Sequence, residues 1–265
     1  YIMTNFLTAA IENKRAEVEA MKLAISESMM FDMARRTRRA PLSLSGAIKG
    51  NYTGIIAEFK RKSPLKGNLN PLADAYEVTK GYQTLGASAI AVMTDTRFYG
   101  GSLSDLAMAS KAVTIPILRM DIIIDKYQIL ESYVYGADAV LLTASILTTD
   151  EIEAMMVVAH RFGMEVMLDI NTADDIKKIP PCTDLIGVNN RDYKTFATDI
   201  DASYNMMPKL PKEIDKVALS GICSHQDIHR LRAIGYSGFL IGETFMKKNN
   251  PAEAMYNFIN PPHMG

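Results

Sequence analysis

The chain has 265 residues, of which 48% are apolar and 22% are charged, and its formal net charge is −1. This composition is ordinary for a globular protein. A charge near zero gives no field that attracts nucleic acid or an anionic membrane, so we expect neither as a partner. No apolar run approaches the roughly 18 residues of a membrane span. The N-terminus contains acidic residues and lacks the apolar core of a signal peptide, so we expect a cytoplasmic protein.

The two cysteines, Cys182 and Cys223, lie far apart and form no CxxC motif. Zinc sites in proteins are built from clustered cysteine and histidine ligands at short spacings. We therefore expect two buried or idle thiols in a reducing compartment, and no metal site.

The first 50 residues precede any strand pattern and have the character of amphipathic helices. We expect residues 1–50 to form a helical extension that caps one end of a barrel spanning residues 51–260. On this interpretation, residues 1–265 are a single domain.

Eight short apolar runs recur about every 20 to 35 residues, with helical patterns between them. The predicted strands are GIIAEF (54–59), AIAVMT (89–94), IPILRM (115–120), AVLLTA (139–144), EVMLDI (165–170), LIGVNN (185–190), KVALSG (216–221) and GFLIGE (238–243). Eight continuous apolar strands alternating with helices predict a parallel (β/α)8 TIM barrel. The competing fold, a doubly wound open sheet, usually carries a glycine fingerprint after its first strand, where this chain has EFKRKSP.

Helix boundaries between the strands carry recognisable capping residues. Thr148, Thr149 and Asp150 precede a helical run that ends at Gly163. Ser224 and Gly235 flank another run in the same way, as N-cap and C-cap candidates.

Functional side chains of such barrels collect at the carboxyl ends of the strands. Because side chains alternate along a strand, Met167 and Asp169 share the inward face. Desolvation among apolar neighbours would raise the pKa of Asp169 and make it a better base at neutral pH. The alternative is an ion pair with Lys60 across the barrel, which would lower that pKa and weaken the base.

The last two predicted strands end in LSGI (219–222) and LIGET (240–244), and the basic loop FKRKSPLKG (59–67) follows the first strand. Glycine turns expose backbone N–H groups that bind phosphate, and barrels often bind it after strands seven and eight. We expect an anion site there. Tight turns and a solvated surface loop are the alternative explanations.

Several segments in order resemble the indole-3-glycerol-phosphate synthase family, from about Asn5 to Phe258. They are IIAEFKRKSPLKG (55–67), FYGGSLSDL (98–106), RMDIIIDKYQI (119–129), GADAVLLTASIL (136–147), IGVNNRDYKTF (186–196), LSGI and FLIGETFM (239–246). The resemblance implies a (β/α)8 barrel with a phosphate site and no cofactor. It also implies decarboxylation and ring closure of a carboxyphenylamino-deoxyribulose phosphate.

Carried over position by position, the resemblance implies catalytic or substrate-contacting roles for Glu58, Lys60, Asn189, Arg191 and Ser220. It implies phosphate binding by residues of the first, seventh and eighth strand ends, namely Ser63, Gly221 and Gly242.

The departures from the family pattern fall on the chemistry. Met120 stands where the family has the lysine that is its general acid, and Ile122 replaces a phenylalanine. Asp169 and Leu219 each stand where the family has a glutamate. A methionine cannot donate a proton, and losing an acid or base commonly costs about 10²–10⁴ in rate. We therefore expect the family reaction to be nearly abolished.

These departures predict a rebuilt site of designed type, with one carboxylate base in an apolar pocket. Kemp elimination, the base-promoted ring opening of a benzisoxazole, is the reaction that suits it, and Asp169 is the expected base. Ser220, Thr143, Asn189, Tyr193 and Lys60 are candidates to donate a hydrogen bond to the leaving oxygen. The predicted substrate contacts are Met93, Met120, Ile122, Leu141, Thr143, Met167, Tyr193, Leu219 and Leu240.

Two alternatives stay open. The first is a divergent natural synthase that keeps the ring closure with Glu58, Lys60 and Asp169. The second is an inactive barrel that only binds a ligand. In each case the expected partner is a small aromatic molecule, with phosphate or sulfate at the inherited anion site.

Overall fold

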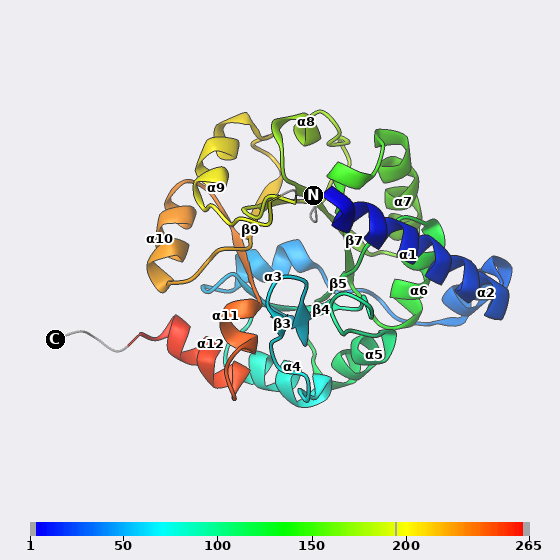
Figure 1. The fold of residues 1–265 in the computed structure, drawn as a ribbon, viewed down its shortest axis with the longest axis horizontal. Coiled ribbons are helices and arrows are strands. Elements are labelled where there is room, and N and C mark those ends of the chain that lie inside the picture. Colours follow the sequence, from blue (N-terminus) through cyan, green and yellow to red (C-terminus); the bar gives the residue numbers. More distant parts are fainter. Residues whose placement is uncertain (1–3, 194, 262–265) are drawn as a thin grey trace.

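The computed structural model describes residues 4–193 and 195–261. Parallel strands close into a barrel in the order β1, β10, β9, β8, β7, β6, β5, β4 (Figure 1). Their bounds are β1 Ile55–Phe59, β4 Ala89–Met93, β5 Ile117–Met120, β6 Ala139–Thr143, β7 Glu165–Ile170, β8 Leu185–Asn189, β9 Asp215–Leu219 and β10 Gly238–Ile241. The predicted TIM barrel is confirmed, and each predicted strand lies within two residues of an observed one.

Most of the helices surround the barrel on its outer side (Figure 1). Before the first strand come α1 Thr4–Ala24, α2 Glu27–Arg36 and α3 Leu44–Gly50. The others are α4 Ala75–Thr84, α5 Leu103–Ala112, α6 Lys126–Val134, η1 Ala144–Ile146, α7 Thr149–Arg161, α8 Ala173–Ile176, α9 Asp201–Met206, η2 Met207–Lys209, α10 His225–Ala233, α11 Glu243–Met246 and α12 Pro251–Ile259. A short antiparallel ribbon of β2 Lys62–Ser63 and β3 Gly67–Asn68 follows β1.

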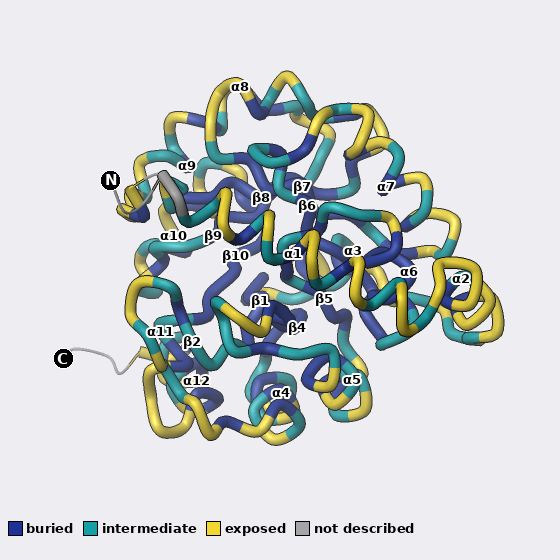
Figure 2. The backbone as a smooth tube through the Cα atoms, turned by 45° about the vertical axis from the view of Figure 1, so that its right-hand side comes forward, coloured by how far each residue is buried: buried dark blue, intermediate teal, exposed yellow. Residues whose placement is uncertain are grey.

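The strands are buried on both faces, which is why their sequences are continuously apolar. Figure 2 shows this buried centre surrounded by exposed outer turns. Alternation divides the strand residues into two packed groups. Ile56, Leu118 and Leu185 fill the barrel interior, while Ile90 and Val140 pack against the helices.

The predicted helix caps are observed. The Thr148 side chain accepts a hydrogen bond from the Glu151 amide, and the Glu151 carboxylate accepts one from the Thr148 amide at 2.8 Å. Ser224 caps α10 in the same reciprocal way. Gly163 and Gly235, which follow the two helices, have φ of +76° and +113°, the left-handed conformation that glycine adopts without strain.

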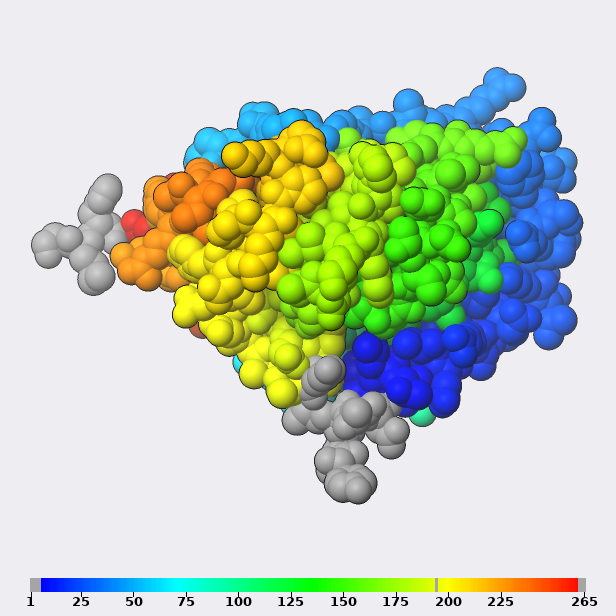
Figure 3. Space-filling model, turned by 90° about the horizontal axis from the view of Figure 1, so that it is seen from above, coloured from blue at the N-terminus to red at the C-terminus, as the bar shows by residue number. Residues whose placement is uncertain are grey.

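Helix α1 is fastened to the barrel by a buried ammonium group. The Lys14 Nζ lies 3.1 Å from Asp95 Oδ2 and 2.9 Å from Asp121 Oδ1, and Lys14 itself is only 4% exposed. Asp95 follows β4 and Asp121 follows β5, so one lysine joins α1 to two neighbouring loops. Figure 3 shows the dark blue N-terminal segment lying against the middle of the chain, drawn in green.

Among the described residues, no helix is both long and apolar enough to cross a membrane, and no cluster of three or more His, Cys, Asp or Glu could hold a metal ion. Cys182 and Cys223 are free thiols, and both are exposed rather than buried.

Replacing Lys14 by Met should lower the free energy of unfolding by about 3–5 kcal/mol, because two carboxylates lose their buried cationic partner. Lys22→Met is the matched control. Lys22 lies on the same helix as Lys14 and pairs with Asp125 in a more exposed setting, where an ion pair contributes about 0–1 kcal/mol. Urea unfolding at pH 7 measures both. Equal losses in the two variants would contradict the anchoring role of Lys14.

Candidate functional site

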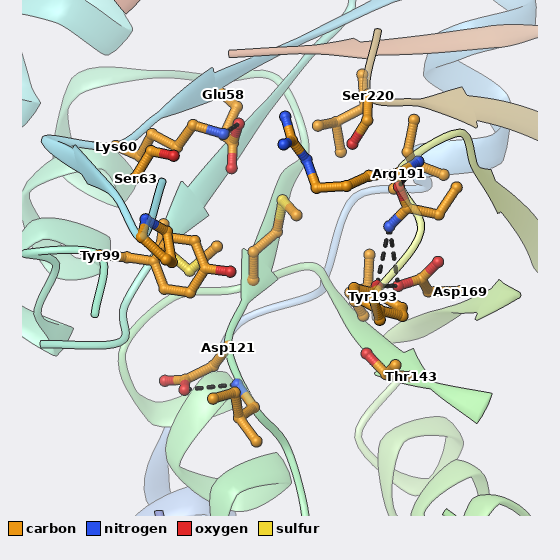
Figure 4. A pocket seen from close by; sticks show the side chains of 18 of the residues that line it. Glu58, Lys60, Ser63, Tyr99, Asp121, Thr143, Asp169, Arg191, Tyr193 and Ser220 are labelled. Atoms are coloured by element: carbon orange, nitrogen blue, oxygen red, sulfur yellow. Dashed lines mark hydrogen bonds and ion pairs between the residues drawn. The ribbon is translucent and has the colours of Figure 1, made fainter. Parts of the chain in front are cut away.

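A cavity opens at the carboxyl ends of the barrel strands (Figure 4). It brings together all five residues expected from sequence to be catalytic, which are Glu58, Lys60, Asp169, Asn189 and Ser220. They come from β1, β7, β8 and β9 and the residues that follow them. Parallel strands bring such distant positions together because all their carboxyl ends lie at one end of the barrel.

The apolar lining also follows expectation, with one exception. The cavity is lined by Met93, Met120, Ile122, Leu141, Thr143, Tyr193, Leu219 and Leu240. Met167 does not reach it, because this side chain is completely buried in the interior beneath Asp169, packed beside Gly187. Inward-facing residues two apart occupy successive layers, so Asp169 covers Met167.

The Asp169 carboxyl group lies in the wall of the cavity, and Asp169 is 1% exposed. Its Oδ2 accepts hydrogen bonds from the Tyr193 hydroxyl and, at 3.4 Å, from Asn189 Nδ2. Its Oδ1 is buried and has no hydrogen-bond partner among the described residues. Burial raises the pKa of Asp169 to about 7, even though the Tyr193 and Asn189 hydrogen bonds act to lower it.

Lys60 does not neutralise Asp169. The Lys60 Nζ lies 2.6 Å from Glu58 Oε2, and no ion pair with Asp169 occurs in the described part of the chain. Lys60 and Glu58 lie two residues apart at the end of the same strand, so they can pair without reaching across the barrel. Asp169 is therefore left with neutral partners, which is the condition that the raised pKa requires.

Met120 presents its thioether to the cavity from the last position of β5. Of its two charged neighbours, Asp121 also lines the cavity, whereas Arg119 does not. The Arg119 guanidinium is buried behind the sheet, 3.1 Å from Asp121 Oδ2 and 2.9 Å from Glu131 Oε2. Strand alternation thus places the Arg119 guanidinium on one side of β5 and the Met120 sulfur on the other, and Met120 supplies no proton donor at this position.

Sequence reasoning from strand ends missed part of the lining. Phe6 and Leu7 come from α1, and Tyr99 and Phe196 from loops. Phe6 contacts Phe98 and Phe196 edge-to-face, with ring centroids 5.0 and 5.1 Å apart. The aromatic pair in FYGGS (98–102) is the one signal in the sequence that could have pointed to this wall.

The predicted phosphate residues separate into two places. Ser63 lines the first cavity, whereas Gly221 and Gly242 line an adjoining one. A Cβ atom at Gly242 would collide with the Glu58 carboxylate, so this glycine makes room for Glu58. Ser220 and Gly221 both have positive φ, +65° and +73°, which turns the chain sharply after β9.

The basic residues of the adjoining cavity already have an anionic partner. Lys66 pairs with Glu243, and Arg191 Nη2 lies 3.7 Å from Glu243 Oε2. Any phosphate entering this cavity would have to compete with the Glu243 carboxylate.

Comparison with known proteins gives a consistent match. The family model described as indole-3-glycerol phosphate synthase matches residues 7–258. The indole-3-glycerol phosphate synthase of Bacteroides thetaiotaomicron is 41% identical over 257 residues, covering 97% of this chain and 98% of that protein. That of Carboxydothermus hydrogenoformans is 39% identical over 259 residues, covering 94% and 98%.

Solved structures of low identity share the fold. An N-acetylmannosamine-6-phosphate 2-epimerase from Clostridium perfringens superposes with a TM-score of 0.60 at 12% identity, over 84% of this chain and 98% of the other. The tryptophan synthase alpha subunit of Legionella pneumophila gives 0.57 at 12% identity, over 81% and 94%. These likenesses support the barrel alone.

The raised pKa of Asp169 predicts a pH-dependent stability. The folded protein holds this proton up to about pH 7, while the unfolded chain releases it near pH 4, so ionisation costs stability as pH rises between these values. Asp169→Asn should stabilise the fold by up to about 4 kcal/mol at pH 8 and have little effect at pH 4. Urea unfolding across this pH range measures the difference, and a pH-independent difference would contradict it.

Glu243→Gln should tighten the binding of inorganic phosphate about three- to tenfold, because a competing carboxylate is removed from Lys66 and Arg191. Lys66→Met should weaken it. Isothermal titration with phosphate measures both variants. An affinity that Glu243→Gln leaves unchanged would mean that phosphate does not bind in this cavity.

Proposed function

Since the chain belongs to the indole-3-glycerol phosphate synthase family, whose reaction is of the lyase type, we propose that it is a lyase whose general base is Asp169. The proposed reaction is proton abstraction from a carbon atom of a small, flat aromatic molecule. Ring opening of a benzisoxazole is the form of this reaction that the cavity suits best.

One observation carries the proposal. Asp169 Oδ1 is buried, lacks a hydrogen-bond partner in the described chain, and belongs to a carboxyl group that lines the cavity. Tyr193 and Asn189 hold the other oxygen and so fix the orientation of the carboxyl group. A base with a pKa of about 7 is half deprotonated at neutral pH and strong enough to accept a proton from carbon.

The reaction starts at this base, in a cavity whose surface is largely apolar. Asp169 Oδ1 takes the proton from the ring carbon beside nitrogen, and the C–H electron pair forms the third bond of the nitrile. The N–O bond breaks and its electron pair stays on oxygen, which gives a cyanophenolate. Met120, Leu141 and Leu240 would contact the flat ring, and their apolar character keeps water away from the carboxylate.

The decarboxylating ring closure of the family is the second candidate, and family membership favours it. The Glu58–Lys60 pair lies in the cavity, and the glycine turns after β9 and β10 are retained. Against it, Met120 and Leu219 supply no proton where the resemblance implies an acid and a second carboxylate. The matched relatives are synthases and give no support to a designed origin.

A side-by-side assay separates the candidates. The protein should open 5-nitrobenzisoxazole with a rate that rises with pH to a plateau, with a midpoint near pH 7, since the deprotonated base is the active form. Asp169→Asn should lose about 10²–10⁴ of this rate. Asp174→Asn, an exposed aspartate on α8, is the control for the substitution and should keep it.

The synthase substrate is assayed under the same conditions. Ring closure without elimination would establish the second candidate. If the protein binds an aromatic molecule but catalyses neither reaction, and if Asp169→Asn leaves this binding unchanged, the protein is a binding protein.

A further inference from the structure

We propose that the Tyr99 hydroxyl donates the hydrogen bond that stabilises the leaving oxygen. This inference rests on the proposed function, since it assigns the second catalytic group of that elimination. Charge develops on the oxygen as the N–O bond breaks, and a donor already in place there lowers the barrier without reorganisation.

The Tyr99 hydroxyl is available for this role. Tyr99 lines the cavity, and no hydrogen bond within the described residues engages its hydroxyl group. Figure 4 shows the ring extending into the cavity from the side opposite Asp169, with the oxygen at its inner end. A flat substrate between the two would present its acidic C–H bond to one and its ring oxygen to the other.

The donors expected from sequence are less suited. Tyr193 and Asn189 already donate to Asp169, and Asn189 also donates to the Tyr193 hydroxyl at 2.9 Å. Lys60 is paired with Glu58. Each would have to give up its present partner to bind the leaving oxygen.

The two remaining hydroxyl candidates lie in the wrong places. Thr143 is the direct cross-strand neighbour of Asp169, so it lies on the side of the base. Ser220 lies where the cavity meets the adjoining one, which it also lines. Among the candidates, Tyr99 is the one that faces the base across the cavity.

The backbone around Tyr99 is held firmly. Asp95 Oδ1 accepts hydrogen bonds from the Phe98 amide at 2.8 Å and the Tyr99 amide at 3.3 Å. The Tyr99 carbonyl accepts one from the Lys62 amide at 3.1 Å. A side chain on such a loop is fixed before the substrate arrives, as a preorganised donor requires.

The two proposed groups titrate separately. Burial, together with the nearby Glu58 carboxylate, raises the pKa of Tyr99 well above its ordinary value. Tyr99 therefore keeps its proton over the whole range in which Asp169 ionises, and remains a donor whenever the base is active.

The test is Tyr99→Phe, assayed with benzisoxazoles whose leaving phenols differ in acidity. We expect kcat/KM to fall about 10- to 100-fold, with the largest loss for the least acidic phenol. The pH midpoint should stay in place. Tyr193→Phe is the matched control, because it removes a hydrogen bond to the base. It should move the midpoint to higher pH and leave the dependence on leaving-group acidity unchanged.

Binding of the product, 2-cyano-4-nitrophenolate, gives a readout that needs no turnover. Tyr99→Phe should weaken binding of the phenolate about tenfold and binding of neutral 3-nitrobenzonitrile, which lacks the oxygen, much less. If the protein turns over but this variant keeps its rate, its leaving-group dependence and its phenolate affinity, the role of Tyr99 is overturned. If the protein does not turn over, the proposed function fails, and the catalytic role of Tyr99 is overturned with it.

Discussion

The chemistry proposed for this barrel depends on the desolvation of one carboxyl group. Asp169 lies at the carboxyl end of β7 with hydrogen bonds on one oxygen only, and burial outweighs those bonds in setting its pKa. Burial of this group costs the fold stability when the carboxyl group ionises, and in the proposed reaction the same burial makes the carboxylate a stronger base toward the substrate. The same carboxyl group in open solvent would be a much weaker base.

Among the described residues, Asp169 has no cationic partner because the basic residues near the cavity pair with other carboxylates. Glu58 forms an ion pair with Lys60. Glu243 pairs with Lys66 and lies near Arg191. Asp121 pairs with both Arg119 and Lys14. Each cation near the cavity thus has a carboxylate closer than Asp169. A cation released from its partner would be attracted to Asp169 and would lower the pKa that the site depends on.

The architecture was largely predictable from sequence, because its signals are local. Burial on both faces makes the strands continuously apolar, and the free N–H groups at helix starts favour capping residues. Asp169 and Met120 were found for the same reason, since strand alternation and strand ends can be read along the chain. Whether Lys60 pairs with nearby Glu58 or with Asp169 could not be predicted, because the choice depends on how far Lys60 lies from a side chain on another strand. Met167 was misplaced because alternation gives the face of a residue and not its layer. Tyr99 and Phe6 were missed because a loop and a distant helix bring them to the cavity.

The ammonium group of Lys14 connects the N-terminal helix to the two loops after β4 and β5, because it pairs with a carboxylate in each loop. Asp95, one of its partners, also holds the backbone of Tyr99, while Asp121 directly follows Met120. The wall of the cavity is therefore specified partly by a residue that precedes the first strand by some forty positions. Exchange of the N-terminal segment between related barrels would keep the sheet intact. It would preserve the shape of the cavity only if the incoming helix also brought a cation to the same place.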